Sequence, residues 1–183
     1  MAVGSTVHRL EIALSDVDRG VYESLDVRLA QHPSESLRYL VTRMLAYALS
    51  YEEGIQFSKG GLSSTDEPPI SIVDPTGILV AWIDVGTPSA ERIHRASKAA
   101  GRVAIWTSTD LALLRKEAEN KAIHRASEIA VHRIDSAFLD ALEAIMNRRV
   151  KIDLTRTDGA LYANVEGKTF ETTLLSDTLA AAE

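Results

Sequence analysis

The sequence predicts a mixed α+β protein that folds as a single domain over residues 1–183. Residues 37–48 carry apolar side chains with the period of an amphipathic helix, whereas residues 5–30 and 148–176 alternate apolar and polar side chains as strands do. A nearly unbroken apolar run over residues 78–85 indicates a strand covered on both faces. With 183 residues, 45% of them hydrophobic, the chain can bury one sizeable core.

An N-terminal hairpin is predicted for about residues 5–30. Apolar side chains occupy alternate positions in two runs, at Leu10, Ile12 and Leu14 and at Leu25, Val27 and Leu29. The polar segment between them, Asp16 to Gly20, supplies the turn.

The first helix is predicted to begin beside Glu35, after Pro33 and Ser34. Its apolar stripe recurs at helical spacing, at Leu37, Leu40, Val41, Met44, Leu45 and Ala48. The helix carries the chain roughly 25 Å from its start, and the extended segment 54–60 brings it roughly 23 Å back. We therefore expect Lys59 at the level of Glu35.

Two further strands, 69–73 and 78–85, are predicted to pair across the turn Asp74-Pro75-Thr76-Gly77, because proline and glycine occupy favoured turn positions there. In a hairpin folded about that turn, Asp84 faces Glu67, one residue from Asp66. Three carboxylates then meet at the end of the sheet where the first helix begins, since Glu35 lies there too.

A second helix follows, with Thr87 as its expected N-cap, Pro88 at its first position and Gly101 as its stop. Residues 102–107 read as the next strand. The predicted order from residue 34 to residue 107 is helix, three-stranded meander, helix and strand.

The remaining elements follow from caps and alternation. Thr109 or Asp110 caps a short helix, residues 129–134 form a strand, and Asp135 caps a further helix. A β-meander over about residues 148–176 is expected to join the N-terminal hairpin in an accessory sheet. The tail from Asp177 is expected to fray.

The acids at the expected sheet end are candidates for a divalent-metal site. Asp84 is the strongest, because a carboxylate in an apolar strand is costly unless it is paired or binds a metal. Asp66, Glu67 and Asp84 are the proposed ligands of Mg²⁺ or Mn²⁺, with Glu35 nearby. The alternatives are a strand-end acid that caps the next helix for Asp84, loop acids for Asp66 and Glu67, and a favourable helix-dipole position for Glu35.

The charge of the chain does not decide whether its partner is a nucleic acid or a protein. The net charge is −6, which gives little non-specific attraction to nucleic acid. Residues 91–133 nevertheless hold nine basic and five acidic residues, a net of +4. Arg92 and Arg95 can reach the acids at about 1.5 Å per residue along the helix, whereas Lys98 is too far. Arg92, Arg95 and Arg102 are therefore the candidate nucleic-acid contacts, with a solvated basic face as the alternative.

Several classes are excluded or disfavoured. The chain has no cysteine, so disulfides, thiolate nucleophiles and cysteine zinc sites are excluded. Its histidines form no metal-ligand pair in the sequence. No stretch is long and apolar enough for a membrane span and no signal pattern opens the chain, so we expect a cytoplasmic protein without membrane association. The oligomeric state is not indicated.

The order of elements and the placement of the acids resemble the core of the PD-(D/E)XK nuclease superfamily. More specifically, the sequence resembles the YaeQ family of bacterial proteins, in the stretches His32-Pro-Ser-Glu35, Ile55-Gln-Phe57, Gly61-Leu62, Asp66-Glu-Pro68, Trp82-Ile-Asp-Val-Gly86 and Pro88. The resemblance implies that Asp66 and Asp84 are metal ligands and Glu35 an auxiliary acid. It also implies that the strand 102–107 pairs beside the first strand of the meander.

One position departs from the nuclease motif, which places a lysine two residues after the last acid. Here that triplet is Asp84-Val85-Gly86, so Lys59 or Arg95 must supply the catalytic cation or catalysis is lost. Two functions stay open: a metal-dependent nuclease or phosphodiesterase, and a non-catalytic regulatory module of the same fold that binds nucleic acid or protein.

Overall fold

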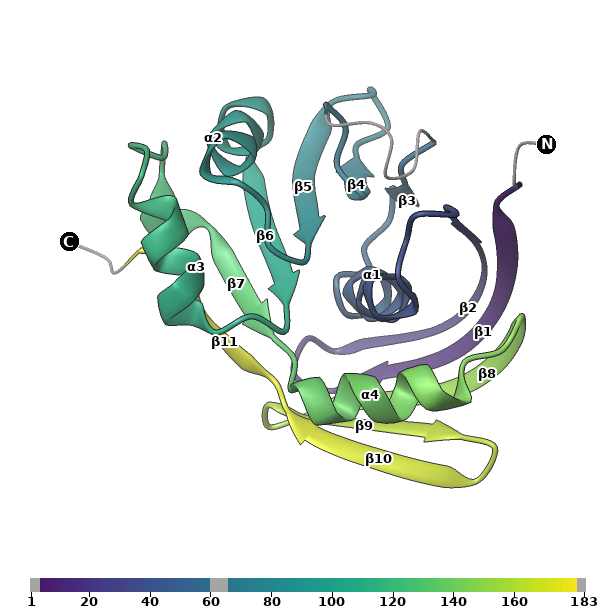
Figure 1. The fold of residues 1–183 in the computed structure, drawn as a ribbon. Coiled ribbons are helices and arrows are strands. Elements are labelled where there is room, and N and C mark those ends of the chain that lie inside the picture. Colours follow the sequence, from purple (N-terminus) through teal and green to yellow (C-terminus); the bar gives the residue numbers. More distant parts are fainter. Residues whose placement is uncertain (1–3, 60–65, 181–183) are drawn as a thin grey trace. The chain divides into compact units, whose positions relative to one another are not determined.

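The computed structural model describes residues 4–59 and 66–180, which contain four α-helices and two mixed β-sheets (Figure 1). The mixed α+β class predicted from the sequence is confirmed. The chain divides into two compact units. The described residues of the first are 4–51 and 134–174, and those of the second are 52–59, 66–133 and 175–180. No helix in these described stretches is long and apolar enough to cross a membrane.

A five-stranded sheet with the order β10-β9-β8-β1-β2 forms the first unit. It joins the N-terminal hairpin to the C-terminal meander, because β1 runs parallel to β8 while the other neighbours are antiparallel. The strands are β1 (Thr6–Asp16), β2 (Val21–Gln31), β8 (Arg149–Thr157), β9 (Ala160–Val165) and β10 (Lys168–Thr173). Alternate side chains of β1, β2, β8 and β9 are buried, so one face of the sheet carries the core and the other meets solvent.

Two helices belong to this unit, α1 (Leu37–Leu49) and α4 (Ser136–Ile145). Asp135 caps α4 as predicted, accepting from two backbone N–H groups. α1 begins later than predicted, because Ser36 is its N-cap and accepts from the backbone N–H of Tyr39. Figure 1 shows α4 lying along the meander, and the two helices contact each other.

The second unit holds a six-stranded sheet with the order β11-β7-β6-β5-β4-β3. Strands β3, β4 and β5 form an antiparallel meander, and β5, β6 and β7 are parallel. The strands are β3 (Ile55–Phe57), β4 (Ile70–Val73), β5 (Leu79–Val85), β6 (Arg102–Thr107), β7 (Ala130–Arg133) and β11 (Leu175–Thr178).

The expected place of β6 is wrong, because β6 pairs with β5 and not with the first strand of the meander. The physical reason lies in β6 itself. Val103, Ile105 and Trp106 are all buried and point to both faces of the sheet, so the strand needs cover on both faces, as strands in the interior of a parallel sheet have. A helix between β5 and β6 returns the chain to the adjacent parallel position.

The predicted register of β4 against β5 is also wrong, by two residues. Ile70 faces Ile83 and Ile72 faces Ala81, with an irregularity next to the turn. The turn is longer than expected, since Ile78 is 63% exposed and its backbone N–H donates to the Asp74 carboxylate. The strand therefore starts one residue later, and continuing the register places Asp84 opposite Pro69 rather than Glu67.

Two helices belong to the second unit, α2 (Ala90–Ala99) and α3 (Leu111–Ala118). The N-cap of α2 is Ser89, not Thr87, whose hydroxyl bonds to that of Thr109 (2.8 Å). The helix ends before Gly101, with Ala100 as its C-cap. Both helices contribute to one buried cluster with the sheet: Trp82, Ile93, Ala96, Ala100, Val103, Ile105, Leu114, Ala118, Ile129, Val131 and Leu179.

Residues 177–180 are ordered, although the sequence predicted fraying from Asp177, and residues 181–183 lie outside the described part of the chain. Asp177 and Thr178 belong to β11, which pairs with β7, and the buried Leu179 donates its backbone N–H to Ile129 (2.9 Å). Arg115 donates to the carbonyls of Thr178 and Leu179. The open edge of β7 and an apolar pocket for Leu179 explain the order, and neither is visible in the local sequence.

We expect Leu179→Ala to lower the free energy of unfolding by about 2–4 kcal/mol, because it empties a buried leucine site. Leu175→Ala in the same segment is the matched control. Leu175 is 52% exposed, so its truncation should change stability by less than about 0.5 kcal/mol. Urea denaturation of both variants measures the difference, and equal losses would contradict the packing role of Leu179.

Candidate functional site

Asp84 is the centre of the candidate site, near the end of β5 and facing α2. The residue is only 2% exposed, and both carboxylate oxygens accept hydrogen bonds. Arg92 Nε donates to Oδ1 (2.8 Å) and Trp82 Nε1 donates to Oδ2 (2.8 Å). Trp82 lies two residues earlier on the same face of the strand. The acid is therefore neither exposed nor a helix cap, which were the alternatives weighed from its position.

Arg92 joins three parts of the second unit. From the first turn of α2 its Nε reaches Asp84, while Nη2 donates to the backbone carbonyl of Glu67 (2.9 Å). Its guanidinium carbon lies 5.4 Å from the centroid of the Trp82 ring, a cation–π distance. Arg92 thus fixes the segment that leads into β4 against β5 and α2.

Two opposing influences, burial and ion pairing, set the pKa of Asp84. Burial raises the pKa of Asp84 and is the largest influence, while the charge and hydrogen bond of Arg92 and the indole N–H of Trp82 act in the opposite direction. The net pKa stays above the ordinary value of 3.8. The ionised carboxylate therefore depends on Arg92 for its stability.

The other two proposed ligands lie nearby but each has its own partner. Asp66 forms an ion pair with Arg95 of α2, and both side chains are exposed. The Glu67 carboxylate accepts from the hydroxyl of Ser58 (2.9 Å). The structure thus brings Asp66 and Glu67 to the same two arginines of α2 that the sequence singled out.

The remaining basic candidates are less closely connected to Asp84. Arg102 donates to both carboxylate oxygens of Glu52 (2.9 and 2.7 Å) at the beginning of β6. Asp84 faces Ile105 in that strand, three residues further along, which is about 10 Å. Lys59 is exposed beyond the end of β3.

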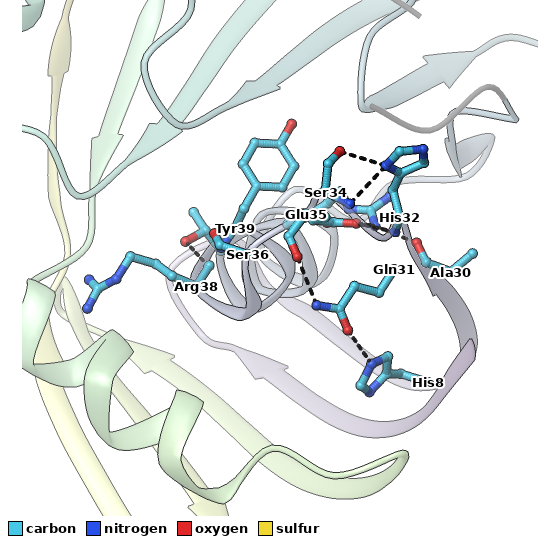
Figure 2. A network of polar contacts seen from close by, with 11 residues as sticks. His8, Ala30, Gln31, His32, Ser34, Glu35, Ser36, Arg38 and Tyr39 are labelled. Atoms are coloured by element: carbon cyan, nitrogen blue, oxygen red, sulfur yellow. Dashed lines mark hydrogen bonds and ion pairs between the residues drawn. The ribbon is translucent and has the colours of Figure 1, made fainter. Parts of the chain in front are cut away.

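Glu35 belongs to the first unit, where it takes part in a buried network (Figure 2). Arg43 of α1 contacts both of its carboxylate oxygens (2.8 and 2.9 Å), and the backbone N–H of His32 donates to Oε2 (3.0 Å). Gln31 donates to the Glu35 carbonyl (3.0 Å) and bonds to His8 through its own carbonyl oxygen (3.0 Å). Figure 2 shows the contacts that run from Glu35 through Gln31 to His8 of β1.

These contacts give Glu35 a structural role. Glu35 and Arg43 are 5% and 4% exposed, so each charge requires the other. Sequence reasoning missed Arg43 and Trp82. The helical period places Arg43 beside the apolar stripe of α1, and the strand period places Trp82 on the same face as Asp84. Both residues could therefore have been found from the sequence.

The fit of a metal ion can be judged from the donors. Within residues 4–59 and 66–180, no three histidine or carboxylate side chains lie close enough together to hold an ion. Both oxygens of Asp84 already accept from Arg92 and Trp82. As arranged, the described side chains do not fit a shared divalent ion, and Arg92 would have to move for one to bind at Asp84. The assignment of Asp66, Glu67 and Asp84 as metal ligands stays a prediction.

The family model and the similar proteins match this chain over nearly its full length. A protein-family model described as "YaeQ protein" matches residues 1–174. "Uncharacterized protein YaeQ" of Escherichia coli (strain K12) is 27% identical over 176 residues, which cover 95% of this chain and 96% of the relative. The protein of the same description in Salmonella typhi is 28% identical over 164 residues, with coverages of 88% and 90%.

Two solved structures share the fold. The crystal structure of YaeQ protein from Pseudomonas syringae superposes with a TM-score of 0.86 at 30% identity and covers 97% of both chains. That of YaeQ protein from Xanthomonas axonopodis pv. citri has a TM-score of 0.85 at 31% identity and covers 97% of this chain and 99% of its own.

The raised pKa of Asp84 predicts a pH signature. A carboxyl whose pKa is raised in the folded state stabilises the fold at low pH, and this contribution is lost as the pH rises above 3.8 through the raised value. The stability of the wild type relative to Asp84→Asn should therefore fall with rising pH, by at most about 1.4 kcal/mol per pH unit. Chemical denaturation across this range measures it.

Asp74→Asn is a control of opposite sign. The hydroxyl of Thr76 and the backbone N–H of Ile78 lower the pKa of Asp74, so its contribution is present above 3.8 and lost as the pH falls. The wild type should gain stability relative to Asp74→Asn with rising pH. The same direction for both variants would show that burial does not dominate at Asp84.

Removing only one member of the buried Glu35–Arg43 ion pair should strongly destabilise the fold. Arg43→Met leaves Glu35 buried without its cation and should lower the free energy of unfolding by about 3–5 kcal/mol. Adding Glu35→Gln should recover part of the loss. Arg38→Met on the same helix removes partly exposed ion pairs with Asp140 and Glu143 and should cost less than about 1 kcal/mol. Similar values for Arg38→Met and Arg43→Met in urea titrations would argue against the pair.

Proposed function

The chain belongs to the YaeQ family, and we propose that it is a non-catalytic member of a nuclease-like fold that acts as a regulatory module by binding another protein. The observation that supports this most is the position of Arg92. Its guanidinium lies between the Asp84 carboxylate and the Glu67 carbonyl, where a metal-dependent phosphodiesterase would hold a cation. A fixed guanidinium neutralises the acid but supplies no exchangeable water as a nucleophile.

The charges favour a protein over a nucleic acid as the partner. Each of the three arginines considered for phosphate contacts has an acidic partner: Arg92 with Asp84, Arg95 with Asp66 and Arg102 with Glu52. A phosphate backbone would have to displace these carboxylates. The net charge of −6 adds no long-range attraction to compensate for that loss.

A metal-dependent nuclease or phosphodiesterase is the second proposal. It is favoured by the position of Asp66, Glu67 and Asp84 near the arginines of α2, and it requires both that Arg92 move away from Asp84 and that the three carboxylates come closer together. The three carboxylates would then hold Mg²⁺ or Mn²⁺, which supplies Lewis-acid activation of the phosphate and its attacking water. Arg95 or Lys59 would stabilise the developing negative charge, while Glu35 is already engaged by Arg43.

Metal titration separates the two proposals. In calorimetry with Mn²⁺ and Mg²⁺ we expect no saturable uptake by the wild type, and heats indistinguishable from those of Asp84→Ala, because Arg92 already neutralises the acid. In cleavage assays with DNA, RNA and a generic phosphodiester, wild type and identically purified Asp84→Ala should give the same background. Any nucleic-acid retention should be unchanged by Arg102→Ala.

Saturable uptake that is lost in Asp84→Ala would instead establish the metal site. Cleavage that is abolished by chelation and reduced about 10²-fold or more in Arg95→Ala or Lys59→Ala would establish the phosphodiesterase. Either result would overturn the non-catalytic assignment. Wild type and Asp84→Ala must be purified in parallel, because a contaminating nuclease would persist in both.

A further inference from the structure

A row of arginines crosses three neighbouring strands on the solvent face of the five-stranded sheet. Arg28 of β2 lies directly opposite Arg9 of β1, and Arg9 lies directly opposite Arg149 of β8. Arg148 precedes Arg149, and its carbonyl accepts from the backbone N–H of Arg9 (2.7 Å). With Val7, these four arginines line a hollow of about 320 Å³. We call it the arginine hollow.

The hollow carries a net positive charge that the described residues only partly neutralise. Arg9 is bound by Asp26 through two hydrogen bonds (2.6 and 3.2 Å). Arg28, Arg148 and Arg149 are exposed and form no ion pair with an acid in the described part of the chain. The four arginines of the hollow and the aspartate bound to Arg9 together carry a net charge of +3.

Such a row is unfavourable without a ligand. Like charges directly opposite each other on adjacent strands destabilise a sheet, and here Arg9 faces an arginine on both sides. An anion in the hollow would convert this repulsion into attraction. Guanidinium groups are also the side chains that bind phosphate with two parallel hydrogen bonds.

The surroundings define the size of the ligand. Two residues further along the same face, Asp26 lies opposite Glu11, and Lys151 lies beside Glu11. This mostly acidic row ends the positive region, so an extended phosphate backbone crossing the sheet would meet carboxylates. The arginines themselves span three strands, about 10 Å at the usual strand spacing, which exceeds one phosphate group.

We propose that the arginine hollow binds a soluble small molecule that carries a diphosphate group. The hollow is at the small end of the range for ligand sites, which suits a compact anion. One phosphate contacts the guanidinium of Arg28 and the other those of Arg148 and Arg149, with Arg9 held between them by Asp26. The site uses only residues of the first unit, so it is independent of the Arg92 cluster and of the proposed function.

Calorimetry of the full chain with inorganic pyrophosphate tests the site. The wild type should show saturable binding that weakens with added salt, and Arg28→Gln and Arg149→Gln should each weaken it about tenfold or more. Lys168→Gln is the matched control. It removes one exposed positive charge from β10 of the same sheet, outside the hollow, and should change the affinity less than about twofold.

Thermal melting supplies a second measurement. Without ligand, Arg149→Gln should melt at or above the wild-type temperature, because it relieves repulsion with Arg9. Pyrophosphate should raise the melting temperature of the wild type more than that of Arg149→Gln at the same concentration, because the variant binds it more weakly.

Three outcomes would overturn the proposal. They are the absence of saturable binding, equal binding by the wild type and both arginine variants, and tighter retention of single-stranded nucleic acid than of pyrophosphate through the same arginines. None of them bears on the metal titration of Asp84, which involves the other unit.

Discussion

The buried carboxylate of Asp84 is the constraint on which the second unit depends. An acid with 2% exposure in a strand of the sheet is stable only if its charge is balanced and its oxygens are hydrogen-bonded. Trp82 and Arg92 meet that need, and in doing so they fix the side of β5 on which α2 packs. The same arginine reaches the Glu67 carbonyl, so the path of the chain into β4 is tied to the same charge.

Each of the two units contains a buried acid that is bound by an arginine. Glu35 is bound by Arg43 and Asp84 by Arg92, and in each case the arginine follows the acid by eight residues on the next helix. The sequence predicts a metal ligand at Asp84 and an auxiliary acid at Glu35. In both cases the arginine satisfies the acid locally, which favours a structural explanation for the acids over a shared reaction centre.

The arginines of this protein fall into two groups. One group is bound to carboxylates, and the other is gathered in the arginine hollow, where a ligand can reach it. Arg43, Arg92, Arg95 and Arg102 each contact a carboxylate. The arginine hollow collects its charge on adjacent strands, where, among residues 4–59 and 66–180, Arg9 alone of its four arginines forms an ion pair with an acid. Because the total charge is −6, such a local excess of positive charge does not follow from composition. The local excess arises because β1, β2 and β8 are neighbours in the sheet. It marks the position of the proposed anion site.

The sequence by itself determined the mixed α+β class, the approximate extents of the helices and strands, the cap Asp135, and the need of Asp84 for a partner, while it left Thr109 and Asp110 as alternatives for one further cap. These follow from local periodicity, capping chemistry and the cost of burying a charge. Only the tertiary structure decided that β6 lies beside β5, that Asp84 lies level with Pro69, and that the partner of Asp84 is an arginine. It also brought β1, β2 and β8 together and so created the arginine row. Strand order, register and the side chains that contact a buried acid depend on contacts between distant segments, which no local pattern encodes.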